Sequence, residues 1–356
     1  MKKKINTIFI GCGRVAQHYK SLLKENPIKD INICGVFDLN FEAAKKFSDG
    51  LCENYFDNFQ ELLKLKDLNL AIICTPSGSH FDQAKILIEK KINLLVEKPL
   101  TLKPKQSEIL INLAKKNKVL LNVAFQNRLN PAIQLLKKSF EEKRFGKVVT
   151  STIRLRWCRK QEYYNDKWHG RWHIDGGVIN QQAIHHIDAF NWIVGPVQKV
   201  CSLSANQLNK LEAEDTFVAI LKLENGGLGT FEATTAARPE DFEASISIVG
   251  EKGIAEIGGV ALNEIKQWKF VEEKEFDKNV KKKFSEKVST GMGLSHLPLL
   301  KKVVKTLLNH ENNVIISGED SLNTTKLIHA LYKSDEENSW IYLSSNPVSS
   351  RLGNNN

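Results

Sequence analysis

Two glycines near the amino terminus have the spacing of a phosphate-binding turn. A short apolar run leads into a glycine turn and the start of a helix in Ile8-Phe9-Ile10-Gly11-Cys12-Gly13-Arg14-Val15-Ala16. Gly11 permits the tight turn, Gly13 lets the backbone approach a phosphate without a Cβ, and Ala16 lets helix and strand pack closely. The free N–H groups of the helix N-terminus would then bind the pyrophosphate of a dinucleotide.

A carboxylate ends the second apolar run. Asp38 lies 22 residues after Ala16, where an acidic side chain accepts hydrogen bonds from the hydroxyls of the adenosine ribose. A 2′-phosphate would meet a like charge there, and the next residues, Leu39 and Asn40, offer no arginine to neutralise it. The pattern predicts NAD rather than NADP. The alternative is that Asp38 serves only as a turn residue.

Two more turns follow apolar runs, and both contain groups that could bind a cofactor. They are Cys74-Thr75-Pro76-Ser77-Gly78-Ser79-His80 and Glu97-Lys98-Pro99. In open α/β sheets ligands bind at the carboxyl ends of the strands, so both turns would face the cofactor. Lys98 stands between an apolar run and a proline that restricts the backbone, which favours a place near the nicotinamide. The alternative is an ordinary surface lysine.

A later segment is rich in aromatic, basic and polar side chains. It runs from Tyr163 to Gly177 and includes Trp168, Arg171 and Trp172. Surface loops are seldom so rich in tryptophan. The segment leads through a double glycine into a predicted helix that carries Gln181, His185, His186 and Asp188. Residues 181 and 185 share one helix face, whereas residue 186 points about 100° away.

The elements that position these groups follow from the hydrophobic pattern. From residue 5 to about 125, apolar runs alternate with amphipathic stretches, which is the order of a parallel sheet covered on both faces. The predicted helices lie near 14–24, 40–49, 58–65, 79–90 and 104–117. The six predicted strands are Ile5–Ile10, Ile31–Asp38, Leu51–Tyr55, Asn69–Cys74, Ile92–Val96 and Val119–Ala124. We therefore expect an α/β fold with a doubly wound Rossmann domain over residues 1–126.

The pattern changes after Gln126, where longer strand-like runs dominate. Helices are predicted near 130–143, 180–193, 295–308 and 320–334, and a charged surface loop over 270–290. Strands are predicted at Lys147–Arg159, Val197–Ala205, Thr216–Leu223, Leu228–Thr235, Glu243–Val249 and Gly253–Ile257. This predicts an α+β domain over residues 127–356, with a large, mostly antiparallel sheet.

Composition limits the classes of partner. The 356 residues are 42% hydrophobic and 26% charged, as in ordinary globular proteins. The net charge of +10 comes from scattered lysines without a basic-aromatic motif, so we expect no nucleic acid partner but some attraction for anionic ligands. Without a long apolar run or a signal-peptide pattern, and with six scattered cysteines, we expect a cytoplasmic protein with no membrane association.

With these motifs the chain resembles the Gfo/Idh/MocA family of NAD(P)-dependent oxidoreductases over about residues 5–345. The resemblance rests on the glycine loop, the T-P-x-x-x-H turn ending at His80, the E-K-P motif at 97–99 and a stretch similar to G-G-x-x-x-D-x-x-x-H. In that stretch Gln181 replaces the aspartate and His185 is the histidine. The resemblance implies that His185 is the acid/base residue and that Lys98 holds the same substrate oxygen. It also implies a homodimer or homotetramer.

Within this family, the stretch Gln161–Asp188 is most similar to UDP-N-acetylglucosaminuronate 3-dehydrogenases of surface-polysaccharide (lipopolysaccharide) biosynthesis. That similarity implies NAD-dependent oxidation of a 3-hydroxyl to a 3-keto sugar. The neutral amide of Gln181 does not repel an anionic sugar, which agrees with a UDP-sugar acid as substrate.

The expected site residues fall into three sets. The catalytic residues are Lys98 and His185. The cofactor-binding residues are Gly11, Gly13, Arg14, Val15, Asp38, Thr75, Pro76, His80, Glu97, Lys98 and Gln126. The substrate-binding residues are Lys98, Arg156, Tyr163, Arg171, Asp175, Gln181 and His185, in which arginines would bind the uronate or diphosphate and Asp175 would position the substrate or the helix start.

Three alternative hypotheses arise from the same sequence. A zinc site could be drawn from His169, His173, His185, His186 and Asp188, but adjacent histidines diverge on a helix and H-E-x-x-H is missing, so we expect no metal. A second enzyme hypothesis is an NAD-dependent dehydrogenase of a free sugar or inositol. A hypothesis from another class is a non-catalytic NAD-binding regulator, against which the presence of both Lys98 and His185 argues.

Overall fold

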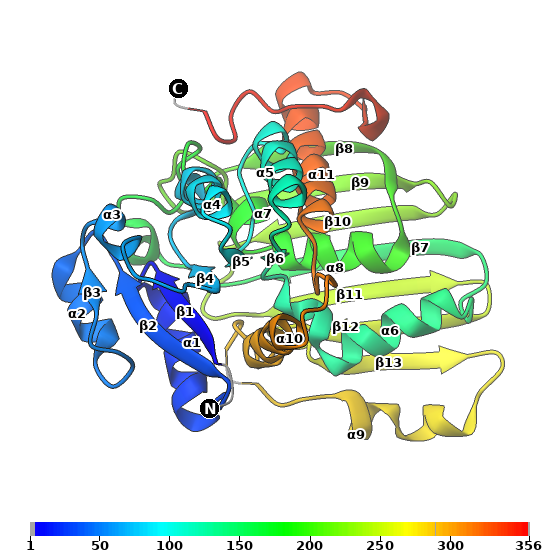
Figure 1. Ribbon diagram of the computed structural model, residues 1–356. Helices are drawn as coiled ribbons and strands as arrows, with labels where there is room; N and C mark the ends of the chain where they lie inside the picture. The colour runs from blue at the N-terminus through cyan, green and yellow to red at the C-terminus, as the bar shows by residue number, and fades with distance from the viewer. Residues whose placement is uncertain (1–3, 289, 355–356) are drawn as a thin grey trace. The chain divides into compact units, whose positions relative to one another are not determined.

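The computed structural model describes residues 4–288 and 290–354, and the chain folds into two compact units (Figure 1). The first comprises the residues up to Phe125 together with His296–Leu322. The second comprises Gln126–Ser295 and the residues from Asn323 onwards. The sequence pattern divides the chain once, after residue 126, so the return of His296–Leu322 to the first unit is a difference from the predicted division.

The first unit is built on sheet A, with strand order β3-β2-β1-β4-β5-β6 and parallel pairing throughout. The order reverses between β1 and β4, the switch point at which open α/β sheets bind ligands. The strands are β1 Ile5–Ile10, β2 Ile31–Phe37, β3 Tyr55–Phe56, β4 Leu70–Ile73, β5 Asn93–Val96 and β6 Leu121–Val123. This confirms the predicted doubly wound sheet, although the third strand has only two residues.

Helices flank this sheet because its strands are apolar on both faces. All four residues of β4 are fully buried, as are Leu94, Leu95 and Val96 of β5. The helices are α1 Arg14–Glu25, α2 Phe41–Ser48, α3 Phe59–Leu62, α4 His80–Glu89, α5 Pro104–Asn117 and α10 His296–Leu308, with the 3₁₀ turn η1 at Ser77–Ser79.

The late helix α10 belongs to the first unit for a physical reason. It packs against α1 and β1. The ring of His296 lies edge-on to the rings of His18 and Tyr19, with centroids 5.0 and 5.2 Å apart. Its apolar residues Leu299 and Leu300 are fully buried. Amphipathic periodicity predicts this helix but not which domain buries its apolar face.

The second unit is built on sheet B, whose strand order is β13-β12-β11-β7-β10-β9-β8-β14. Every pair is antiparallel except β7 with β10, which confirms the mostly antiparallel sheet. The strands are β7 Val148–Arg156, β8 Val197–Ala205, β9 Thr216–Leu223, β10 Leu228–Thr234, β11 Glu243–Gly250, β12 Gly253–Gly258, β13 Glu264–Phe270 and β14 Ile341–Tyr342.

Helices α6, α7, α8 and α9 of the second unit contact strands of sheet B. The α-helices are α6 Pro131–Glu141, α7 Val178–Gln181, α8 Ile184–Val194, α9 Val280–Phe284 and α11 Gly318–Glu337, of which the part from Asn323 lies in this unit. The 3₁₀ turns are η2 Gln126–Leu129, η3 Gln161–Tyr164, η4 Glu275–Asn279 and η5 Leu343–Ser345. The single helix predicted over 180–193 is thus two helices, and 270–290 is partly helical.

The strands of sheet B alternate between a buried and an exposed face. In β9, Phe217 and Leu221 are buried, whereas Val218 and Ile220 are 45% and 54% exposed. This alternation is typical of an antiparallel sheet with helices on one face only. Among the helices of residues 4–288 and 290–354, none is both long and apolar enough to cross a membrane.

Candidate functional site

The glycine loop lies at the carboxyl edge of sheet A, between the ends of β1, β2 and β4. Gly11 has φ +89°, and its N–H donates to the Phe37 carbonyl at 2.7 Å. A Cβ on Gly11 would lie 2.7 Å from the carbonyl carbon of Cys74, so only glycine fits. Gly13 is the N-cap of α1, and a Cβ there would meet nothing within 4 Å. The helix N-terminus is therefore open at this position, as the predicted binding of a pyrophosphate there requires.

Asp38 is fixed beside this loop. Its Oδ2 accepts a hydrogen bond from the Cys12 N–H at 2.8 Å, and its Oδ1 accepts one from the Asn40 N–H at 2.9 Å. The carboxylate therefore joins the glycine loop to the end of β2 and remains partly exposed. The structure therefore shows Asp38 as a turn residue, and its binding of the adenosine ribose remains a prediction.

His80 joins the other two predicted turns to each other. Its Nδ1 lies 2.8 Å from the Pro99 carbonyl and its Nε2 lies 2.9 Å from the Thr75 carbonyl. The ring is buried, and that burial lowers its pKa. The Thr75 hydroxyl donates to Gln83 at 2.7 Å. The ring thus connects the T-P-x-x-x-H turn to the E-K-P turn, and its contact with the cofactor remains a prediction.

Glu97 and Lys98 follow β5 at the same edge. The Tyr19 hydroxyl donates to Glu97 Oε1 at 3.2 Å, and His296 Nε2 lies 3.8 Å from the same oxygen. Burial raises the pKa of Glu97 to about 7, while the charge of Lys98 acts in the opposite direction. Lys98 itself is half-buried. Lys98 therefore lies at the carboxyl edge of sheet A, whereas the Glu97 side chain points into the core of the first unit.

Gln181 and His185 lie in the second unit, on the helix pair α7 and α8. In the run Val178–Phe190 these two residues are half-exposed and the other eleven are buried. His186 is 1% exposed, and neither ring nitrogen has a hydrogen-bond partner among the described residues. Burial lowers the pKa of His186 to about 3, so this histidine stays neutral. Of the two adjacent histidines, His185 is the one that faces outward.

The helix α8 is held by a buried ion pair. Arg128 donates from Nε and Nη2 to the two carboxylate oxygens of Asp188, at 2.7 and 2.8 Å. The Thr324 hydroxyl donates to the same carboxylate at 2.8 Å. Bidentate pairs of this kind fix orientation as well as distance. Asp188 is therefore a structural group of the helix.

The aromatic segment forms its own compact arrangement. The Asp166 carboxylate binds His169 Nδ1, and the His169 ring lies 4.3 Å from that of Tyr163 and 3.5 Å from that of Trp168, between centroids. Asp175 is buried, and its Oδ2 accepts from the Gly170 N–H at 3.1 Å. Its carboxylate closes the turn before α7, which agrees with a role in positioning the helix start.

Arg156 and Arg171 occupy different surroundings. Arg171 is exposed within the aromatic segment. Arg156 ends β7, where Glu232 accepts from its Nε and Nη2 at 2.6 Å each and Glu243 from its Nη1 at 3.1 Å. It borders a cavity of about 400 Å³ together with Thr216, Thr234 and Arg238.

The strand alternation places Arg156 on the exposed face of sheet B, whereas α7 and α8 pack on the other face. Within one chain, the structure does not bring Arg156 together with Gln181 and His185. The sequence could have predicted this separation, because buried residues alternate along β7 at positions 151, 153 and 155, and residue 156 therefore points to the opposite face.

Two buried groups near the site were not found from the sequence. Glu214 lies beneath the start of α7, where its Oε1 accepts from the Ile179 N–H at 3.1 Å. The Tyr332 hydroxyl of α11 donates to the same oxygen at 3.0 Å. Burial raises the pKa of Glu214 to about 8. Its neighbours in the sequence are acidic, so Glu214 has the signature of a surface residue, and only the structure shows its burial.

The histidines and the aspartate considered for a zinc site do not form one in the described part of the chain. Within residues 4–288 and 290–354, no group of three or more histidine, cysteine, aspartate or glutamate side chains is placed to hold a metal ion. His169 is engaged by Asp166, His186 is buried against Trp157, and Asp188 is bound to Arg128.

Comparison with known proteins identifies the family. Residues 5–125 match the family model described as oxidoreductase family, NAD-binding Rossmann fold. Residues 137–343 match the model described as oxidoreductase family, C-terminal alpha/beta domain. The chain belongs to the Gfo/Idh/MocA family of oxidoreductases. It is therefore an NAD-dependent dehydrogenase of this type, with NAD as the cofactor of its first domain.

Two solved structures are similar to almost the whole chain. The WlbA dehydrogenase from Chromobacterium violaceum, in complex with NADH and UDP-GlcNAcA, is 31% identical with a TM-score of 0.88, over 96% of each chain. The WlbA dehydrogenase from Bordetella pertussis, with the same two ligands, is 30% identical with a TM-score of 0.90, over 96% of this chain and 98% of that one. A UDP-N-acetylglucosamine 3-dehydrogenase from Acidithiobacillus ferrooxidans is 31% identical over 139 residues, 38% of this chain and 41% of that protein.

Proposed function

We propose that this protein oxidises the 3-hydroxyl of a UDP-linked sugar acid of the UDP-N-acetylglucosaminuronate type, with NAD as the acceptor, in surface-polysaccharide biosynthesis. The observation that carries the proposal is the pair Gln181 and His185, the two half-exposed positions in the otherwise buried run Val178–Phe190. The similarity to two dehydrogenases solved with NADH and UDP-GlcNAcA supports the choice of substrate.

The chemistry assigned to the residues is that of alcohol oxidation. His185 takes the proton of the 3-hydroxyl as general base, since a neutral imidazole titrates near working pH. NAD held at the glycine loop would supply the acceptor for the hydride of carbon 3. The Lys98 ammonium donates to the same oxygen and stabilises the negative charge that develops on it. The balance is a secondary alcohol converted to a ketone, with one proton and one hydride removed.

The preference for an acidic sugar follows from the local charges. Gln181 is a neutral amide, which donates to oxygen without repelling a carboxylate. Arg171 is an exposed residue of the aromatic segment and can pair with a uronate or a phosphate. The net charge of +10 raises the local concentration of a substrate that carries both groups.

The experiment is an oxidation assay with three substrates. Purified protein, in excess over substrate, is mixed with NAD and UDP-N-acetylglucosaminuronate, UDP-N-acetylglucosamine or myo-inositol, and NADH absorbance is followed through the first turnover. We expect kcat/KM for the sugar acid to exceed that for either neutral compound by about 100-fold, the effect of a lost ion pair in a built site. Mass spectrometry should show that the product of the sugar acid has lost the mass of two hydrogen atoms relative to the substrate.

The outcome separates the three hypotheses. NADH formation with myo-inositol alone would identify a dehydrogenase of free polyols. Binding of NAD without NADH formation from any of the three, together with an unchanged cellular role for Lys98→Ala, would identify a regulator. Either result contradicts the proposed function.

A further inference from the structure

The double glycine that begins α7 is enclosed on two sides. A Cβ on Gly176, which has φ +76°, would lie 2.8 Å from Cδ1 of Leu352. A Cβ on Gly177 would lie 2.0 Å from the Glu214 carboxylate. Both distances are below any real Cβ contact, so the two glycines allow Leu352 and Glu214 to press directly on the turn.

The amides that follow the turn are bound by buried groups. The Gly177 N–H donates to the Tyr332 hydroxyl oxygen at 3.2 Å, and that hydroxyl donates to Glu214 Oε1 at 3.0 Å. The Ile179 N–H donates to the same carboxylate oxygen. Tyr332 is fully buried and Glu214 nearly so. The start of α7 is therefore fixed to α11 through a short hydrogen-bonded chain.

The carboxyl-terminal residues complete this enclosure. The Gly353 N–H donates to the Trp172 carbonyl at 2.8 Å, and Leu352 is fully buried. The Arg351 guanidinium lies 5.7 Å from the centre of the Trp172 ring. The same tryptophan ring packs edge-on to Tyr332, with centroids 5.0 Å apart. These carboxyl-terminal residues thus contact Trp172, which lies in the aromatic segment four residues before Gly176.

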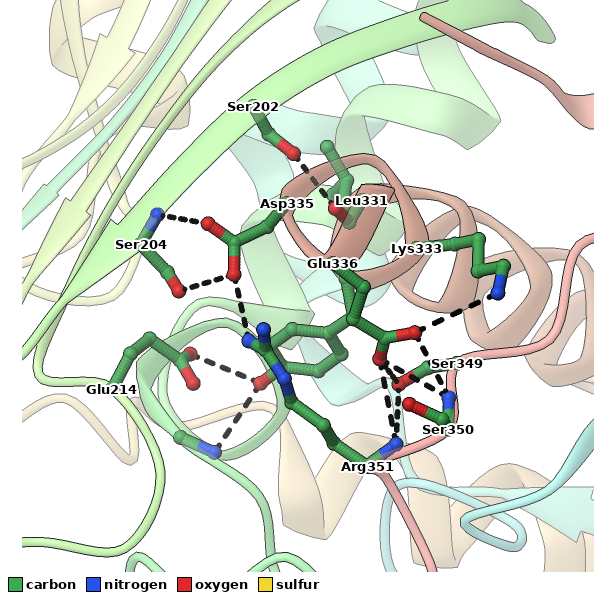
Figure 2. Close-up of polar contacts among 12 residues, drawn as sticks. Ser202, Ser204, Glu214, Leu331, Lys333, Asp335, Glu336, Ser349, Ser350 and Arg351 are labelled. Carbon is green, nitrogen blue, oxygen red and sulfur yellow. Dashed lines mark hydrogen bonds and ion pairs between the residues drawn. The ribbon is translucent and has the colours of Figure 1, made fainter. Parts of the chain in front are cut away.

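A second set of contacts holds the tail in place (Figure 2). The Glu336 carboxylate of α11 accepts from the Ser350 N–H at 3.1 and 3.0 Å and from the Ser349 hydroxyl. Arg351 pairs with Asp335 at 2.7 Å. Asp335 also accepts from the N–H and hydroxyl of Ser204 in β8, at 2.7 and 2.8 Å. The tail is therefore anchored to α11, and Asp335 connects the same helix to β8.

We propose that residues Ser349–Gly353, which we call the tail clasp, are a positioning element for the substrate side of the active site. The tail clasp fixes the turn from Trp172 to Gly177, and this turn sets the direction of α7 and α8, which carry Gln181 and His185. No clasp residue takes part in the chemistry. The inference rests on the proposed function for its effect on turnover, but its structural part is independent of the substrate.

The test compares clasp variants with a matched control. Leu352→Ala removes the contact with Gly176, and Glu336→Ala releases Ser349 and Ser350 from α11. The control is Glu337→Ala, which removes a carboxylate from the next residue of α11, where Glu337 pairs with Lys333 at 3.0 Å. We expect kcat for the sugar acid to fall by at least about tenfold in both clasp variants.

Two features distinguish positioning from general loss of stability. The dissociation constant for NADH should stay within about twofold of wild type, because the cofactor edge belongs to the first unit. Leu352→Met, which keeps the volume, should restore kcat. Equal losses of NADH binding and kcat in Leu352→Ala, or the wild-type kcat in both clasp variants, would overturn the proposal.

A measurement without substrate separates this inference from the proposed function. Amide hydrogen exchange at Gly177 and Ile179 should accelerate by at least about tenfold in Leu352→Ala and Glu336→Ala and stay unchanged in Glu337→Ala. A wild-type protein that oxidises no UDP-sugar acid contradicts the proposed function, while the exchange result still decides the clasp. Unchanged exchange in both clasp variants refutes the clasp, whatever the activity.

Discussion

Two adjacent histidines show how burial assigns roles that composition leaves open. The His186 ring is buried edge-on against Trp157, with centroids 6.1 Å apart, and burial lowers its pKa to about 3. A group that stays neutral and enclosed cannot exchange protons with a substrate. His185 is half-exposed one position earlier on the same helix. The helical angle of about 100° between neighbours produces this contrast.

The first prediction concerns this pair. His185→Ala should lower kcat for the sugar acid by at least about 100-fold, because the transition state loses its general base, while NADH binding is retained. His186→Asn, the control, should lower the free energy of unfolding but leave kcat within a few-fold. Steady-state kinetics and denaturant unfolding measure both effects, and equal kinetic losses in the two variants would contradict the assignment.

A second prediction at this scale concerns the buried carboxyl of Glu214. Burial raises its pKa from 4.5 to about 8. Between these values the folded protein holds a proton that the unfolded chain has released, so the free energy of unfolding falls as the pH rises from 4.5 to 8. Glu214→Gln should remove this decline, which is on the order of a few kcal/mol. Urea unfolding at several pH values measures it.

The control for this prediction is Glu212→Gln, since Glu212 is exposed two residues away. It should keep the wild-type dependence of stability on pH. A Glu214→Gln variant that keeps the same slope as wild type through the whole window would show that the carboxyl is ionised in the folded protein.

At the scale of an element, the glycine loop separates folding from cofactor binding. Gly11 needs its positive φ and has Cys74 backbone against it, whereas Gly13 has an ordinary φ of −72° and open space where a Cβ would be. Gly11→Ala should therefore destabilise the free protein by more than about 1 kcal/mol. Gly13→Ala should leave its melting temperature unchanged but raise the dissociation constant for NADH by at least about tenfold, because its methyl group would occupy the phosphate space.

Thermal unfolding without cofactor and fluorescence titration with NADH measure the two effects separately. Gly13→Ala serves as the folding control for Gly11→Ala. If Gly13→Ala binds NADH with wild-type affinity, this loop is excluded as the pyrophosphate-binding site.

The elements also show which parts of the fold the sequence can predict. Continuous apolar runs predict the parallel strands of sheet A, since strands buried on both faces admit few other residues. The strand β13 escapes prediction because exposed Lys266, Gln267 and Lys269 interrupt its apolar pattern. The break between α7 and α8 escapes because Gln182 and Ala183 are both compatible with a helix. Local pattern does not contain the tertiary contacts that decide such cases.

The candidate site shows the same division. Motifs predict Gly11, Asp38 and Lys98 because short-range geometry around a phosphate or a strand end dictates the residue type. Glu214 and Tyr332 lie 118 residues apart in the chain and meet only after folding. Their contacts with the start of α7 depend on long-range packing, for which sequence periodicity carries no signal.

At the scale of the whole molecule, the exposed face of sheet B carries an apolar patch that we define as Leu203, Val218, Ile220 and Leu228. These side chains are 45–59% exposed, with Leu203 at 59% and Ile220 at 54%. Leu203 and Val218 are direct cross-strand neighbours between β8 and β9. Contiguous apolar side chains on an uncovered sheet face are typical of an interface between subunits. We therefore infer that this face pairs with a second copy in a homodimer or homotetramer.

The last prediction tests this pairing. The double variant Leu203→Lys, Ile220→Lys places two charges in the apolar patch, and burying each unpaired charge would cost several kcal/mol. We expect the wild-type protein to have a mass that is a multiple of 40.3 kDa by light scattering, and the variant to shift toward 40.3 kDa with an unchanged circular dichroism spectrum. Val271→Lys is the control, because Val271 is 79% exposed but lies after β13, outside the patch. A wild-type mass of 40.3 kDa at micromolar concentration, or an oligomer that survives both lysines, would exclude this face as the interface.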